Sequence, residues 1–159
     1  MSNREVSLLR VPFRRTFDLV HLKGLHKWLF QDIYEWAGTT RSVGLTKGQS
    51  VFAKPMFIEA QARTMFLQLH SENLLRHVSI DDLAQRLAWY YGNLNSLHPF
   101  REGNGRTQRL FFRQLLGPRG LRLNWSDITA DEKIAACVAS HNGDDSHLAA
   151  LFKRTLETK

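Results

Sequence analysis

The sequence predicts a mainly α-helical bundle with one short β-hairpin, folded as a single domain over residues 1–159. Three observations support this class. Apolar residues recur at helical spacing in several stretches. One stretch, residues 39–55, has a strand-like composition instead. A length of 159 residues with 43% hydrophobic side chains suits one core, and no repeat or low-complexity segment interrupts the pattern.

The first helix is predicted to begin at Thr16 or Asp18, either of which can cap its N-terminus. Gly38 is a natural stop for it. The apolar positions of this helix are Leu22, Leu25, Leu29 and Ile33.

Residues 39–55 are rich in Thr, Ser and Val and contain Lys47-Gly48 in the middle. This composition predicts a short β-hairpin or an extended flap. Pro55 is expected to end it.

A second helix is expected at 56–74, and a third follows Ser79, a capping residue with early acids behind it. Trp89 and the two tyrosines of the third helix are assigned to the core rather than to a stacking surface. The apolar face of the third helix comprises Leu83, Leu87, Tyr90, Tyr91, Leu94 and Leu97.

Three more helices are predicted in the last third of the chain. One starts at 104 and ends at Gly117-Pro118, another follows Thr129 with capping-box spacing, and a last one is capped by Ser146 and runs to the end. The first of these three would turn inward Leu110, Phe111, Leu115 and Leu116.

The net charge is +7, from 22 Lys and Arg against 15 Asp and Glu. The arginines bunch at 101–113, which suits a polyphosphate pocket better than a DNA track, and no nucleic-acid-binding motif is present. Nucleic-acid binding is therefore not expected as the main function.

Cys137 is the single cysteine, which excludes an internal disulfide, and its helical apolar surroundings predict a core position.

No apolar run is long enough to span a bilayer, and the N-terminus lacks the apolar stretch of a secretory signal. We therefore expect a cytoplasmic protein without membrane attachment. Later delivery into a host or target cell by another route stays open.

The loop "HPFREGNGRTQR", His98 to Arg109, concentrates the chemistry of the chain. A glycine-containing loop that runs into a helix N-terminus binds anions through free backbone N–H groups. Arg106 and Arg109 are three apart on the first turn, and two guanidinium groups there would fit a di- or triphosphate. Asn104 can donate to a phosphate oxygen.

Glu102 would repel phosphate unless a divalent cation lies between them, and Mg²⁺ is typically held by one or two carboxylates plus phosphates. His98 lies at the mouth of this site and can accept a proton from a hydroxyl that attacks phosphorus. Phe100 is expected to point into the core, and Arg101 and Arg113 to be solvated or to support the site from outside. The remaining histidines are interpreted as structural: His21, His26, His70, His77, His141 and His147.

This loop resembles the signature of Fic-domain proteins, H-P-F-x-[D/E]-G-N-G-R-x-x-R, at every constrained position. The stretches "LFQDIYEWAGTTR", "SVFAKP" and "ASHNGDDSHLAALF" are also similar to the family. The resemblance covers about Phe17 to Phe152, the expected core of a Fic-type helical bundle.

The resemblance implies transfer of AMP from Mg·ATP to a Ser, Thr or Tyr hydroxyl of a target protein. His98 would be the general base and Glu102 the Mg²⁺ ligand. The nucleotide-binding residues would be Gly103, Asn104, Gly105, Arg106 and Arg109, with Asn142 at the adenine end. The target-docking flap would comprise Leu45, Thr46, Lys47, Ser50, Val51 and Phe52.

Two comparisons within the family refine this expectation. Doc-type kinases replace the second glycine of G-N-G by lysine, whereas this chain has Gly105, so phosphorylation is the weaker reading; UMP and phosphocholine transfer stay open. The family's inhibitory pattern [S/T]-x-x-x-E-[G/N] does not occur in the sequence. The resemblance then implies a toxin held in check by a separate small antitoxin, or a delivered effector. The N-terminus also starts close to the first core helix, so a trimmed chain is an alternative.

Overall fold

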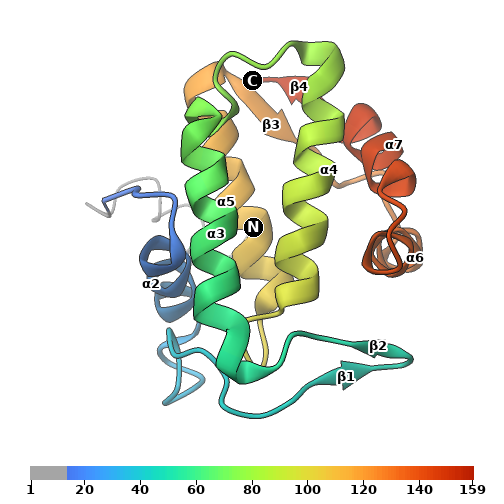
Figure 1. Cartoon of the computed structure of the whole chain (residues 1–159). Coiled ribbons are helices and arrows are strands. Elements are labelled where there is room, and N and C mark those ends of the chain that lie inside the picture. Colours follow the sequence, from blue (N-terminus) through green and yellow to red (C-terminus); the bar gives the residue numbers. More distant parts are fainter. Residues whose placement is uncertain (1–13) are drawn as a thin grey trace.

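The computed structural model describes residues 14–159, and residues 1–13 lie outside this part. The described chain is mainly helical with a small β-hairpin, which confirms the predicted class (Figure 1). The helices are α2 Leu19–Phe30, α3 Ile58–Ser71, α4 Ile80–Leu97, α5 Asn104–Leu116, α6 Ala130–His141 and α7 Ser146–Thr155. Single 3₁₀ turns are η1 Pro55–Phe57, η2 Asn73–Leu75 and η3 Gly117–Arg119.

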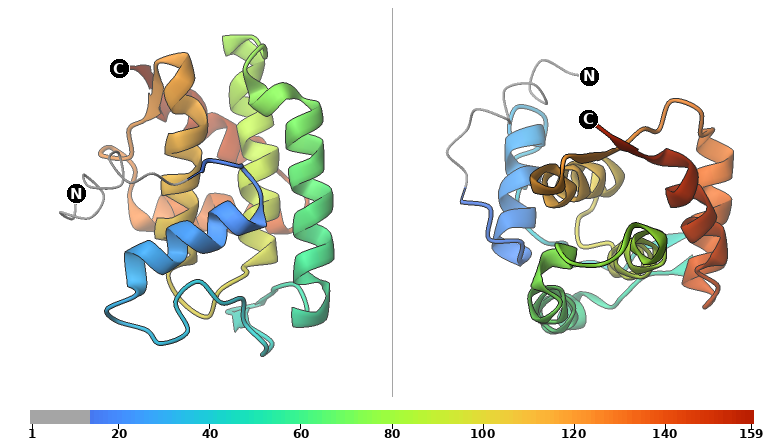
Figure 2. Two further views of the ribbon diagram at one scale, coloured as in Figure 1. Left: turned by 90° about the vertical axis from the view of Figure 1, so that its left-hand side faces the viewer. Right: turned by 90° about the horizontal axis from the view of Figure 1, so that it is seen from above.

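Helix α4 is the centre of the bundle. It packs against α3 and α5 on one side and against α6 and α7 on the other. Helix α2 runs across the bundle and contacts α5 and α3 (Figure 2). The C-terminus of α4 and the N-terminus of α5 therefore meet at one end of the molecule, joined by the loop that begins at His98.

The predicted apolar face of α4 is confirmed. All six of its predicted residues are buried, and Tyr90 and Tyr91 are each only 2% exposed. They join Phe111, Phe112 and Phe152 in one aromatic core, where side chains of this size contribute most of the buried apolar area. The end of α4 that carries His98 is therefore held rigidly by packing.

The first helix begins as predicted but ends earlier. Asp18 Oδ1 accepts a hydrogen bond of 2.9 Å from the His21 amide, which is the expected cap. The helix stops at Phe30, not at Gly38, and Ile33 is 64% exposed rather than part of the apolar face. Gly38 adopts a left-handed conformation, φ +82°, and lies against Lys27, so this segment folds back beside the helix instead of extending it.

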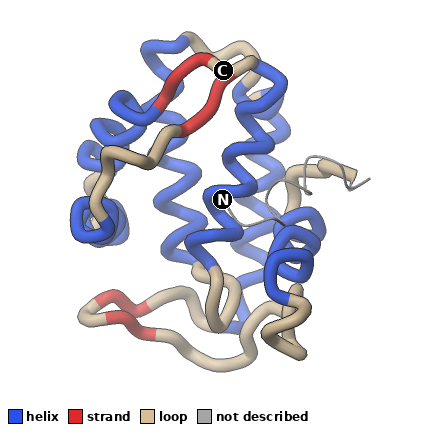
Figure 3. The backbone as a smooth tube through the Cα atoms, turned by 180° about the vertical axis from the view of Figure 1, so that it is seen from behind, coloured by secondary structure: helices blue, strands red, loops and turns tan. Residues whose placement is uncertain are grey.

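The predicted hairpin is present. Strand β1 Thr46–Lys47 pairs antiparallel with β2 Ser50–Val51, and Gly48 takes a positive φ of 57° in the turn. Pro55 begins the 3₁₀ turn η1, so the hairpin ends where expected. The hairpin projects from the end of the bundle that carries His98 (Figures 1 and 3).

A second two-stranded sheet was not predicted: β3 Leu121–Leu123 pairs antiparallel with β4 Leu156–Thr158 at the opposite end of the bundle (Figure 3). The last helix stops at Thr155 and the chain continues as β4. Strands of three residues are too short to show alternation, and the two segments are far apart in the sequence, so the pattern could not reveal them.

Besides Asp18, the predicted caps Ser79 and Thr129 are confirmed: each side chain accepts a hydrogen bond from the amide three positions on. Ser146 is not a cap. It is the first residue of α7, and its amide donates to Asp144 Oδ1 at 3.0 Å. Within the part that the structure describes, no helix is long and apolar enough to cross a membrane.

Candidate active site

His98 ends helix α4 and opens the loop. Its backbone is left-handed, φ 45° and ψ 64°, an unusual conformation for a side chain of this size. Its Nδ1 lies 3.1 Å from the Asn95 carbonyl oxygen. A carbonyl can only accept, so in the neutral ring Nδ1 carries the proton and Nε2 is left as the proton acceptor.

The imidazole of His98 is enclosed. It is 7% exposed, and the Phe52 ring stacks on it with centroids 4.0 Å apart and planes within 8°. Burial lowers the pKa of His98 to about 4, and the positive charges of Lys47 and Arg41 act in the same direction. The ring is therefore neutral at pH 7, the state that a general base requires.

Asn104 closes the loop on itself. Its Oδ1 accepts from the Phe100 amide at 2.9 Å, and its Nδ2 donates to the Phe100 carbonyl at 2.6 Å. Phe100 is buried as expected, at 1% exposed. The structure thus gives Asn104 a role in shaping the loop, and its contact with phosphate stays a prediction.

Gly103 is the N-cap of α5 and has φ 81°. A Cβ at this position would lie 2.4 Å from the Phe30 ring, so only glycine fits both the conformation and the space. The Thr107 hydroxyl donates to the Gly103 carbonyl at 2.8 Å and holds the turn. The first amides of α5 have no partner inside the helix, which makes this end suitable for an anion.

His26 fixes the loop from the opposite side. It is fully buried, its Nδ1 accepts from the Gly38 amide at 2.8 Å, and its Nε2 lies 2.9 Å from the Glu102 carbonyl oxygen. Its ring stacks on Phe100 at 3.9 Å. The interpretation of His26 as structural is correct, but 76 residues separate it from Glu102. No local pattern could have linked the two.

A cleft of about 740 Å³ opens beside His98. Its walls are the hairpin, the C-terminal half of α4, the start of α5 and one face of α6. Predicted site residues on its lining are His98, Gly105, Asn142 and, from the hairpin, Lys47, Ser50 and Phe52.

The predicted pair of arginines diverges. Arg106 is exposed, and its guanidinium lies 4.6 Å from the centroid of the Phe30 ring. Arg109 hydrogen-bonds the Tyr91 hydroxyl, on the cleft side. A Cβ at Gly105 would lie 3.4 Å from the Arg109 guanidinium, so a larger side chain there would crowd it. Joint binding of one ligand by the two arginines stays a prediction.

Lys133 of α6 is a cleft residue that the sequence reading missed. It is half-buried, and burial together with the charge of Arg109 lowers its pKa. None of the carboxylates that the structure describes forms an ion pair with it. Two neighbouring cations without an acid are expected to attract an anionic ligand. Cys137, one turn on, also lines the cleft, and it is half-buried rather than a full core residue.

Most of the remaining predicted residues are exposed or half-buried. Glu102 is exposed at the loop. In the hairpin, Leu45 and Ser50 are half-buried, and Phe52 is buried against His98. The exposed hairpin residues are Thr46, Lys47 and Val51.

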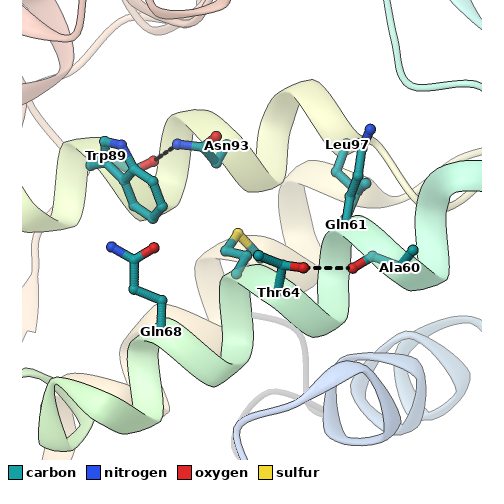
Figure 4. Close-up of a pocket in the computed structure, with 8 residues that line it drawn as sticks. Ala60, Gln61, Thr64, Gln68, Trp89, Asn93 and Leu97 are labelled. Atoms are coloured by element: carbon teal, nitrogen blue, oxygen red, sulfur yellow. Dashed lines mark hydrogen bonds between the residues drawn. The ribbon is translucent and has the colours of Figure 1, made fainter.

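A second hollow, of about 580 Å³, lies between α3 and α4 (Figure 4). None of the residues that line it is titratable, and Trp89 is the largest of them. Asn93 Nδ2 donates to the Trp89 carbonyl, and Thr64 Oγ1 donates to the Ala60 carbonyl, so these polar groups serve their own helices. Unlike this hollow, the cleft beside His98 is lined by titratable side chains, which include His98, Lys133 and Cys137.

A helical bundle with a neutral histidine and a glycine-rich anion loop at a helix N-terminus defines a phosphate-handling enzyme class. Residues 16–116 match the Fic/DOC family, and the chain belongs to this family.

Relatives and solved structures agree with this assignment. The chain is 42% identical over 153 residues to protein adenylyltransferase VbhT of Bartonella schoenbuchensis. The matched stretch covers 96% of this chain and 32% of VbhT. The chain is 38% identical to probable protein adenylyltransferase y4lH of Sinorhizobium fredii, over 87% of the chain and 73% of that protein. The crystal structure of BepC, a VirB-translocated effector of Bartonella tribocorum with bound AMPPNP, superposes with a TM-score of 0.87 at 27% identity, over 98% of this chain and 82% of that one. The chain spans about a third of VbhT.

Proposed function

We propose that this chain is a protein adenylyltransferase that transfers AMP from ATP to a hydroxyl side chain of a target protein and releases pyrophosphate. The observation that carries the proposal is His98, neutral, with Nε2 as its acceptor, on the wall of a cleft beside an anion-binding loop. The names of the relatives and the nucleotide analogue in BepC support it.

In the proposed reaction, His98 Nε2 accepts the proton of a Ser, Thr or Tyr hydroxyl as its oxygen attacks the α-phosphorus of ATP. The new bond joins that oxygen to the α-phosphorus, and the bond from this phosphorus to the bridging oxygen of the β-phosphate breaks. Pyrophosphate leaves with the electron pair, and the proton passes from His98 to solvent. The hydrogen bond from Nδ1 to the Asn95 carbonyl holds the neutral ring in the required tautomer before the transfer, and it can persist when Nε2 is protonated.

The phosphates would be bound by backbone N–H groups at the start of α5, around Gly103, Asn104 and Gly105, where the helix dipole favours negative charge. Lys133 would add positive charge from the α6 wall of the cleft, and Arg109 from beside Tyr91, which also lines the cleft. Arg106 would reach the outer phosphates by leaving its position over the Phe30 ring. Asn142 would lie toward the adenine end.

Mg²⁺ is implied by the family. Among the described residues no group of three or more acidic, His or Cys side chains could hold a metal ion, but Glu102 offers one exposed carboxylate at the loop. One carboxylate completed by phosphate oxygens is the usual donor set for Mg²⁺ in nucleotide sites, so Glu102 fits. When bound, the ion would neutralise charge that develops on the leaving pyrophosphate.

The hairpin would present the target. Its exposed edges offer backbone groups for strand-like pairing with an extended segment, and Lys47, Ser50 and Phe52 face the cleft. A hydroxyl held on this segment would then face His98, which Phe52 covers on one face.

The same proposal extends to regulation. Because no inhibitory pattern occurs in the sequence, a separate small antitoxin would supply the inhibitory helix. The Bep proteins among the similar structures are translocated effectors, and delivery into another cell from the cytoplasm is the second setting that fits.

The test is a pair of parallel reactions in bacterial and eukaryotic lysates, one with α-labelled and one with γ-labelled ATP, each with His98→Ala as control. We expect a His98-dependent protein band from the α label alone. A band from the γ label alone would make the enzyme a kinase and refute the proposal. Parallel reactions with labelled UTP and CDP-choline test the other donors of this fold.

A further inference from the structure

Arg41 is a buried cation with an unusual set of partners. It is 3% exposed, and its guanidinium donates only to backbone carbonyls. None of the carboxylates described in the structure forms an ion pair with it. Burial of an unpaired charge costs several kcal/mol unless its donors are hydrogen-bonded, so the stability of Arg41 at this position depends on these carbonyl contacts.

These carbonyls belong to three segments. Arg41 Nε donates to the His98 carbonyl at 2.7 Å and Nη2 to that of Leu97 at 3.2 Å. On the hairpin side, Nη1 donates to the Val43 carbonyl at 2.8 Å and Nη2 to that of Ala53 at 2.6 Å. One rigid group therefore joins both stems of the hairpin to the end of α4.

The electrostatics support this arrangement. The last carbonyls of α4 have no hydrogen-bond donor inside the helix, and they carry the negative end of the helix dipole. A guanidinium supplies both the donors and a positive charge. Charge-assisted hydrogen bonds are about twice as strong as neutral ones. The backbone adds two parallel links, from the Arg41 amide to the Pro99 carbonyl at 2.9 Å and from the Ala53 amide to the Ser96 carbonyl at 3.2 Å.

We propose that Arg41 is a positioning residue that fixes the hairpin relative to His98, so that a target segment on the hairpin is held at reacting distance from the base. The role in catalysis rests on the proposed function; the mechanical link between hairpin and His98 does not. Phe52, which stacks on His98, lies on the stem that Arg41 holds through Ala53.

The protein contains a matched control. Arg119, in η3, also donates only to carbonyls, those of Leu75 at 2.7 Å and Val78 at 2.8 Å. These carbonyls precede α4, at the end of the bundle opposite to His98. Loss of either arginine removes carbonyl contacts of the same kind, but only Arg41 touches the hairpin.

The test compares Arg41→Met, Arg41→Lys and Arg119→Met by hydrogen exchange of the free protein, with peptides covering 41–54 and 95–100. We expect Arg41→Met to speed hydrogen exchange of the backbone amides at positions 41 and 53 at least tenfold. The amides of α5 and α7 should exchange at nearly the wild-type rate. Arg41→Lys, which keeps the charge but not the fork, should lie between Met and wild type. Arg119→Met should leave the hairpin at wild-type rates.

Wild-type hairpin exchange in both Arg41 variants would overturn the proposal, and so would an equal rise over the whole chain, which marks a general stability residue. If Arg41→Met does not fold, Arg41→Lys alone decides by the same criterion.

A second readout addresses catalysis. In His98-dependent labelling with α-labelled ATP, the Arg41 variants should lose about 10- to 100-fold in rate, as expected for a small misplacement of reacting groups. AMPPNP affinity should stay within about threefold, because the proposed nucleotide contacts lie at the start of α5 and along α6 to Asn142, away from Arg41. A parallel loss of affinity would refute the positioning role. If the wild type labels nothing, the proposed function fails, while the exchange experiment still tests the link.

Discussion

Acidification should destabilise this protein through His98, and the size of the effect follows from its burial. Its pKa is about 4 in the folded chain against 6.5 for an exposed histidine. Between these values the unfolded chain binds more protons than the native one, so the free energy of unfolding falls as pH drops below 6.5. At pH 5 the unfolded histidine is almost fully protonated and the native one about one-tenth, which corresponds to a loss of about 2 kcal/mol relative to pH 7.5.

The assay is urea unfolding at pH 7.5, 6.5 and 5.0 for the wild type and His98→Asn. Asparagine tolerates the left-handed backbone at this position and does not titrate. His21 and His26, whose pKa values are also lowered by burial, contribute to both proteins and cancel in the comparison. The wild type should lose about 2 kcal/mol more than the variant between pH 7.5 and 5.0. Parallel curves for the two proteins would refute the argument that His98 is buried and neutral.

Three further predictions concern the loop and the cleft. Gly103→Ala should cost about 2–4 kcal/mol in urea unfolding, because a Cβ would meet the Phe30 ring at 2.4 Å in a left-handed backbone; a loss under about 1 kcal/mol would contradict this geometry. Arg109→Ala should weaken ATP binding by about 1.5–3 kcal/mol in calorimetry, and wild-type affinity would show that it does not reach the nucleotide. Lys133→Met should weaken ATP binding about 3- to 30-fold, with a steeper loss for ATP than for adenosine, whereas equal losses would assign it to the nucleoside.

The elements that the sequence predicted correctly are those with a local signal. Helical spacing along α4 gave its buried face, and the Ser79 and Thr129 caps gave two helix starts. The loop was identifiable for the same reason: twelve consecutive residues contain its chemistry. A packed helix and a glycine turn each depend on residues that are close in the sequence, so their patterns can be recognised from a short segment.

The parts that the sequence did not predict depend on long-range pairing. His26 reaches Glu102 across 76 residues, and Arg41 reaches His98 across 57. No local pattern distinguishes Arg41 from the other arginines of the sequence, or Lys133 from other polar positions of its helix. Only the packing of α2, α6 and the hairpin around the loop gives these residues a role, and no short window of sequence contains that packing.

The low pKa of His98 has a consequence for how the proposed base would work. A base with a pKa near 4 is neutral at pH 7 but weak, and proton transfer is most efficient when the pKa lies near the operating pH. In the free protein, burial and the charges of Arg41 and Lys47 keep it low. A bound triphosphate brings several negative charges into the same cleft, and opposite charge nearby favours the protonated ring. The nucleotide would thus raise the pKa of His98 from about 4 toward the operating pH, so His98 would become a stronger base only when the substrate is bound.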